Sequence, residues 1–196
     1  ISYTLHMSLI DLIKHRKSCR KFDPSRPVPP ELVEKCLEAA RHAPSACNSQ
    51  PWHFIIISDE TTRRQICDKA LCTGLYKMNA FCRDAPVLVA LVSEKIRFWA
   101  TVGSQTRDTR YYLIDIGIAG EHFALQAEEL GLATCWLGWF DEKAVKKTLG
   151  VPRGKRIDVM LALGYADSRW HGKPHPRKEL NEMSSFNVYR PIESDT

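Results

Sequence analysis

The chain has 196 residues, of which 44% are hydrophobic and 26% are charged, as expected for one globular domain with its own core. Lys and Arg number 28 and Asp and Glu 23, which gives a formal net charge of +5. This mild excess contains no dense basic run, so it argues against nucleic-acid binding and suits a small anionic ligand. No apolar run reaches the roughly 18 to 20 residues that span a bilayer, and residues 1–6 lack the pattern of a secretory signal. We therefore expect a cytoplasmic protein that does not bind membranes.

The seven cysteines form no C-x-x-C pair, and their number is odd. Neither a disulfide scaffold nor a tetrahedral zinc site is indicated, so no metal site is expected. The sequence instead predicts reduced thiols in a reducing compartment, several of them packed as small apolar residues.

The first third of the chain predicts helices around one buried strand. Apolar residues at helical spacing predict a helix over 8–15 and, after a proline-rich break, a second helix that runs to about His42. Pro44 ends this helix, because proline disfavours helical geometry in the residue before it. The β-branched and aromatic run 52–58 predicts a strand. Residues 61–70 are expected to form a helix.

The rest of the domain alternates in a similar way. Strands are predicted over 85–93, 134–140 and 156–165, and a long, largely buried helix over 109–130, where glycines allow close backbone approach. A further helix begins after the N-cap residue Asp141 and ends at Gly150, while Gly131 caps the long helix.

A polar tail begins at about residue 167, and we treat the whole of 1–196 as one domain that includes it. The tail holds Phe186, Val188 and Tyr189, which makes it too apolar to be simply solvated, so we expect it to lie on another surface such as a second subunit. The sequence does not show the regular strand–helix alternation of a parallel nucleotide-binding sheet. It also lacks a G-x-G-x-x-G motif and a P-loop. Any nucleotide must therefore be held by other means.

A basic stretch, R-K-S-C-R-K, occupies residues 16–21. In an extended chain, alternate side chains share a face, so Arg16, Ser18 and Arg20 would point the same way. Two guanidinium groups and a hydroxyl suit a phosphate and ring carbonyls. From composition alone, a solvated basic turn is the alternative.

Two further stretches could contact a flat heterocycle. Residues 43–52 place Asn48 and Gln50 in a bend of small residues, and their amides can both donate and accept hydrogen bonds at a ring edge. Residues 136–140 place Gly138 between bulky side chains, which leaves a bare backbone N–H beside apolar walls. An ordinary loop and an aromatic core cluster are the respective alternatives. A late basic segment, 173–178, is by itself a solvated loop.

Four stretches together resemble the FMN-dependent nitroreductase family over roughly residues 6–182. They are R-K-S-C-R-K-F (16–22), A-P-S-A-C-N-S-Q-P-W-H-F (43–54), G-L-A-T-C-W-L-G-W-F-D (131–141) and L-A-L-G-Y (161–165). The resemblance implies an α+β fold with a central, mostly antiparallel sheet flanked by helices. It also implies an intertwined homodimer with two non-covalent FMN sites at the subunit interface.

The resemblance also implies which residues bind FMN. Arg16, Ser18 and Arg20 of one subunit would meet the phosphate and the pyrimidine side of the ring, together with Lys17, which stands where many members have Arg. The bend from the other subunit would contribute Pro44, Ser45, Asn48 and Gln50. The segment over the ring would contribute Leu137 and Gly138, and the late basic residues at the phosphate would be Arg177 and Lys178. Cys47 departs from the small residues usual beside the Asn. No residue is nominated as a catalytic acid or base.

The implied activity is that of an NAD(P)H-dependent FMN oxidoreductase. A hydride from NADH or NADPH would pass through the flavin to a nitroaromatic, a quinone or a similar flat acceptor. Both substrates would use one open face, which predicts ping-pong kinetics. The alternatives are a flavin enzyme of different chemistry on the same scaffold, such as reductive dehalogenation or flavin fragmentation, and a non-catalytic FMN-binding protein. A cysteine hydrolase using Cys47 or Cys135 has no partner residues at a supporting spacing.

Overall fold

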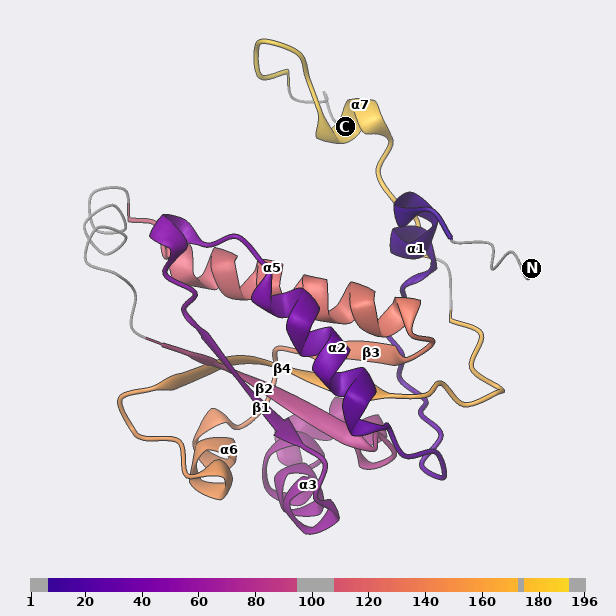
Figure 1. Cartoon of the computed structure of the whole chain (residues 1–196), viewed down its shortest axis with the longest axis vertical. Helices are drawn as coiled ribbons and strands as arrows, with labels where there is room; N and C mark the ends of the chain where they lie inside the picture. The colour runs from indigo at the N-terminus through magenta and orange to yellow at the C-terminus, as the bar shows by residue number, and fades with distance from the viewer. Residues whose placement is uncertain (1–6, 95–107, 173–174, 191–196) are drawn as a thin grey trace.

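The core of the protein is a four-stranded sheet in the order β1-β2-β4-β3, in which all neighbouring strands are antiparallel. The computed structural model describes residues 7–94, 108–172 and 175–190 (Figure 1). The strands are β1 (Trp52–Ile57), β2 (Val87–Ser93), β3 (Ala133–Leu137) and β4 (Arg156–Gly164). The predicted α+β fold with an antiparallel sheet is thus confirmed.

Helices surround this sheet at nearly the positions that the sequence predicts. They are α1 (Leu9–His15), α2 (Pro30–Arg41), α3 (Glu60–Ile66), α5 (Tyr111–Glu129), α6 (Glu142–Leu149) and α7 (Leu180–Met183). Shorter turns are the 3₁₀ segments η1 (Ala46–Asn48) and η3 (Gly74–Arg83) and the π-turn η2 (Cys67–Leu71). The predicted helix over 61–70 is therefore an α-helix only as far as Ile66, and neither η3 nor α7 was predicted.

The sheet is covered on both faces. Helices α2 and α5 lie over one face, and α3 and α6 lie on the other (Figure 1). Each face has its own hydrophobic core. The core under α2 and α5 contains Ile116 and Phe123 of α5, and the core under α3 and α6 contains Val145 of α6. Strand β2 is buried along nearly its whole length, which is why it is a continuous apolar run and lacks the alternation of a strand with one wet face.

Helix α5 approaches β3 closely at Gly120. A Cβ atom added to Gly120 would lie 2.3 Å from the Cη2 atom of Trp136 on β3. The helix can occupy this position only because residue 120 has no side chain. This contact confirms the prediction that glycines in the long helix allow close packing.

The predicted helix caps are also present. The Asp141 carboxylate accepts a hydrogen bond from the Ala144 N–H at 3.0 Å, and so begins α6. Gly131 and Gly150 adopt positive φ angles of 74° and 67° after α5 and α6, the left-handed conformation that glycine tolerates at a helix C-terminus.

All seven cysteines are free thiols, and five of them are buried, which confirms that several pack as small apolar residues. Among the residues described, no helix has the length and apolar character needed to cross a membrane.

Candidate functional site

The basic stretch lies against the outer edge of the sheet. Ser18 forms a parallel bridge with Thr134 of β3, where the Cys19 N–H donates to the Thr134 carbonyl at 2.8 Å. Further along, Phe22 bridges Ala166, just after β4. These contacts fix residues 16–22 beside the strand that leads to Leu137 and Gly138.

The two arginines of this stretch have different surroundings. Arg16 is half-buried, and its Nε lies 3.3 Å from the Glu121 carboxylate on α5. Arg20 is exposed. Burial raises the pKa of the Cys135 thiol, and the charges of Arg20 and Arg16 oppose that rise, which places both guanidinium groups within electrostatic reach of β3. Arg20 is therefore the freer cation for an anionic ligand.

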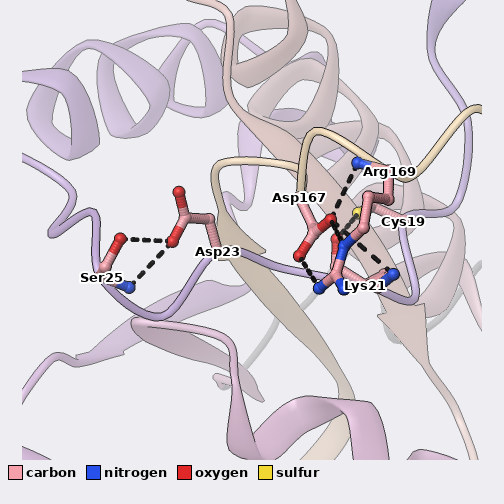
Figure 2. A network of polar contacts seen from close by, with 6 residues as sticks. All are labelled: Cys19, Lys21, Asp23, Ser25, Asp167 and Arg169. Carbon is pink, nitrogen blue, oxygen red and sulfur yellow. Dashed lines mark hydrogen bonds and ion pairs between the residues drawn. The ribbon is translucent and has the colours of Figure 1, made fainter.

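A polar network holds the basic stretch to the chain that leaves β4 (Figure 2). Asp167 accepts hydrogen bonds from the Arg169 guanidinium at 2.9 Å, and the Lys21 ammonium lies 3.7 Å from the same carboxylate. The hydrogen bonds from Arg169 lower the pKa of Asp167 most, and the charge of Lys21 lowers it further. The Cys19 thiol donates to the Lys21 carbonyl at 3.2 Å. The network thus positions the backbone between Ser18 and Lys21.

The second predicted motif forms a strained loop. Cys47, Asn48 and Gln50 all have positive φ angles, of 52°, 49° and 46°, which non-glycine residues adopt only when their surroundings impose it. The Gln50 N–H donates to the Ser45 hydroxyl at 2.9 Å, and the Gln50 side-chain amide donates to the side-chain Oδ1 of Asn48 at 3.0 Å. Asn48, Gln50 and Pro44 are exposed, so these amides can meet a ligand.

A buried carboxylate anchors this loop to α5. Asp115 is only 4% exposed, and its Oδ1 accepts a hydrogen bond from the Ala46 N–H at 3.1 Å. Its Oδ2 is buried without a hydrogen-bond partner among the described residues. Burial raises the pKa of Asp115. The sequence analysis missed this residue, although an acid between Ile114 and Ile116 of an apolar helix was a possible signal.

The third motif turns out of the sheet sooner than predicted. Strand β3 ends at Leu137, so the prediction of a strand as far as Phe140 is wrong. The reason is that the Trp139 carbonyl accepts a hydrogen bond from the buried Asn79 amide at 2.7 Å and does not pair with β4. Leu137 is buried, whereas Gly138 is exposed. The aromatic-core alternative does not hold at Trp139, which is 57% exposed.

The late basic residues lie on an exposed tail. Arg177 and Lys178 belong to a tail, 175–190, in which every residue is exposed. Figure 1 shows α7 and the tail projecting from the sheet and its helices. Both residues are therefore left exposed in the single chain.

The first two motifs also lie far apart in one chain. The loop with η1 lies beside the N-terminal end of α5, whereas α1 and the start of the basic stretch lie near its C-terminal end (Figure 1). Two hydrogen bonds mark these ends, one from the Ala46 N–H to the Asp115 carboxylate and one between His15 and Glu128. The 19 residues of α5 correspond to about 28 Å.

Comparison with known proteins assigns the family. The nitroreductase family profile matches residues 13–165 of the chain. An oxygen-insensitive NADPH nitroreductase of Helicobacter pylori is 26% identical over 178 residues, covering 78% of this chain and 85% of that protein. An iodotyrosine deiodinase of Thermotoga neapolitana is 28% identical over 194 residues, covering 89% of this chain and 95% of that protein.

A solved structure agrees with this match. A nitroreductase family protein of Clostridium difficile 630 is 27% identical, with a TM-score of 0.73 over 93% of this chain and all of that one. Because the profile spans well over half of its residues, this chain belongs to the nitroreductase family.

Proposed function

We propose that this protein is an NAD(P)H-dependent FMN oxidoreductase that reduces a nitroaromatic, a quinone or a similar flat acceptor. Membership of the nitroreductase family and the name of the Helicobacter pylori relative support the reaction class. The observation that carries the proposal is the set of exposed groups with complementary chemistry at the three motifs.

The residues present fit a flat, phosphorylated ring. Arg20 offers an exposed cation, and Asn48 and Gln50 offer exposed amides on a rigid, strained loop. A Cβ added to Gly138 would meet no atom within 4 Å, so the backbone there is open to a ring. Bound FMN would supply a two-electron carrier between a nicotinamide and an acceptor.

A complete site requires two subunits. The strained loop is anchored at Asp115 near the start of α5, whereas Arg16 pairs with Glu121 further along it, so we infer that the FMN-binding set converges across a homodimer interface. The tail supports the same proposal, because Phe186 and Tyr189 are 88% and 86% exposed in the single chain. Such large apolar side chains in one short segment indicate a surface that a partner covers. Arg177 and Lys178 would reach the phosphate of a shared site through this tail.

The chain's own residues would bind and polarise the cofactor. Arg20 beside the pyrimidine edge would favour negative charge there and so raise the reduction potential. Arg16, neutralised in part by Glu121, would serve the phosphate less strongly. The open face at Gly138 would admit nicotinamide and acceptor in turn, which gives ping-pong kinetics.

Reductive dehalogenation is the second candidate. The iodotyrosine deiodinase of Thermotoga neapolitana matches a larger share of this chain than the Helicobacter pylori relative does, 89% against 78%. The same binding residues would serve both reactions, and the acceptor chosen at the open face would differ.

Anaerobic stopped-flow absorbance tests the reaction. The purified yellow protein is mixed with NADH or NADPH, and then with a nitroaromatic, a quinone or an iodinated phenol. Bleaching by nicotinamide followed by recovery with a nitroaromatic or quinone supports the proposal, whereas iodide release with the phenol supports the second candidate. A protein that binds FMN but is not bleached by either nicotinamide is a binding protein, and the proposal is then wrong.

Mixed dimers test the shared site. Arg20→Ala and Asn48→Ala each damage both sites of their own homodimer. In a mixed dimer, one site carries both changes and the other carries neither. After subunit exchange of equal amounts, about one quarter of all sites should bind FMN normally. If mixing restores no binding, the two residues act within one subunit.

A further inference from the structure

Two thiols lie side by side on the π-turn η2, outside the site described above. Cys67 begins this turn, and the Cys72 N–H donates to the Cys67 carbonyl at 2.8 Å. Cys72 follows the turn directly, so this five-residue spacing stacks the two residues on adjacent turns, and both pack in the same core cluster. Turns of this kind are rare and are often found at functional sites.

The two thiols differ in exposure and charge. The neighbouring Cys67 thiol lowers the pKa of Cys72, burial opposes this, and the positive charge of Arg83 lowers the pKa further. The Cys72 thiol and burial raise the pKa of Cys67, which is only 2% exposed. Cys72 is half-buried. The pair therefore combines a half-buried thiol of lowered pKa with a buried thiol of raised pKa, an asymmetry that favours the first as the reacting sulfur.

The pair is connected to the loop that follows β3. The Cys72 thiol donates to the Asn79 carbonyl at 3.5 Å, and the Asn79 side-chain amide donates to the Trp139 carbonyl at 2.7 Å. The Asp141 N–H donates to the Ala70 carbonyl within the π-turn at 3.1 Å. A change at Cys72 is thus two hydrogen bonds away from the backbone next to Gly138.

We propose that Cys67 and Cys72 form a hydroperoxide-reactive dithiol that closes to an intramolecular disulfide. The Cys72 thiolate attacks the terminal peroxide oxygen, so an S–O bond forms, the O–O bond breaks and an alcohol or water leaves. The Cys67 sulfur then attacks the Cys72 sulfenic acid, so the S–S bond forms, the S–O bond breaks and water leaves. Two thiols are oxidised and one peroxide is reduced.

Oxidation also alters the hydrogen bonds around the pair. The disulfide has no thiol proton, so the Asn79 carbonyl loses the donor that Cys72 provides. This proposal does not depend on FMN binding, because the thiols and their partners all belong to the chain.

Cys82 is the competing partner. Cys82 is fully buried and burial raises its pKa, as is also true of Cys67. The difference is in the backbone, because the Cys67 carbonyl accepts the Cys72 N–H, whereas the Cys82 carbonyl accepts the Ala85 N–H at the end of η3. Cys47 is exposed but lies on the strained loop, apart from this cluster. The geometry thus favours Cys67 as the residue that resolves Cys72.

Peptide mapping tests the proposal on the full reduced chain. The protein is treated with hydrogen peroxide, blocked with N-ethylmaleimide and digested with trypsin. Cleavage after Arg64, Lys69 and Lys77 separates the two thiols into peptides 65–69 and 70–77. We expect these peptides to be joined, about 2 Da lighter than their sum, and separated by dithiothreitol. Cys72 should be consumed at least about tenfold faster than Cys82.

Two variants provide the controls. Cys67→Ser removes the resolving thiol, so Cys72 should accumulate as a sulfenic acid that dimedone traps. Cys82→Ala should still form the joined peptides. The proposal is overturned if peptide 70–77 joins peptide 78–83 instead, or if Cys72 stays reduced while Cys47 is oxidised. Circular dichroism of each variant confirms that the fold is intact.

Discussion

Replacing Asp115 tests whether the strained loop is held from outside. The Asp115 carboxylate lies on α5 and accepts the N–H of Ala46, a residue 69 positions earlier in the sequence. Asp115→Ala removes the acceptor, whereas Asp115→Asn keeps a carbonyl oxygen in the same place. We expect the alanine variant to weaken FMN binding and the asparagine variant to preserve most of it.

The magnitude follows from the contacts. Ala46 is half-buried, and an N–H shielded from water and left without a partner costs up to about 1–3 kcal/mol. The three non-glycine residues with positive φ in this loop show that it is strained, so it can relax once this bond is lost. If binding must reimpose the native loop at a cost of 1–3 kcal/mol, the FMN affinity falls by about 5- to 150-fold.

The pH dependence has a definite sign. Because burial raises the pKa of Asp115 above its usual 3.8, the folded state holds this proton more tightly than the unfolded state does. The associated stability is present below pH 3.8 and is lost as pH rises through the folded pKa. Asp115→Asn carries no such charge, so it should be at least as stable as the native chain at neutral pH.

Two measurements decide the outcome. Fluorescence titration gives the FMN affinity, and hydrogen exchange at the Ala46 amide reports the loop without any ligand. Asp59→Ala is a matched control, since Asp59 accepts the Thr62 N–H at 2.7 Å away from the loop. If Asp115→Ala leaves both the affinity and the Ala46 exchange unchanged, the anchoring argument is wrong. If exchange rises while the native chain itself binds no FMN, only the proposed function fails.

Three further changes have expected outcomes. Arg20→Ala should weaken FMN binding about tenfold or more in a fluorescence titration, because charge-assisted contacts contribute about 1.5–3 kcal/mol, and Arg20→Lys should restore part of it; equal affinities would remove Arg20 from the site. Phe186→Asp should shift the protein from dimer to monomer in light scattering, and an unchanged mass would contradict a role for the tail in assembly. Gly120→Ala should lower the free energy of unfolding by about 1–3 kcal/mol in urea, because the new methyl group meets Trp136. Gly154→Ala, which meets no atom within 4 Å, should have little effect.

The regular elements could be predicted because their causes are local. Strand β2 is a run of β-branched and aliphatic residues, and α5 repeats apolar residues at helical spacing, so each is visible in a short window. Caps such as Asp141 and Gly150 are equally local, since the cap residue and its hydrogen-bond partner lie within a few positions.

The errors arise where the deciding partner is remote. The end of β3 depends on Asn79, which lies 60 positions from Trp139, and no window around residue 140 contains it. The role of Asp115 depends in the same way on Ala46. The FMN-binding residues came from resemblance to a family, and their convergence stays a prediction because it needs a second chain.

The division of the proposed site between two ends of α5 has a thermodynamic consequence. If Arg20 and Asn48 of different subunits bind the same FMN, the cofactor binds the dimer and not the isolated chain. Ligand that binds only one state stabilises that state by mass action. FMN should then strengthen dimerisation, and dilution below the dimer dissociation constant should release FMN. A site complete within one chain would show neither effect, so the concentration dependence of the bound flavin distinguishes the two arrangements without any substitution.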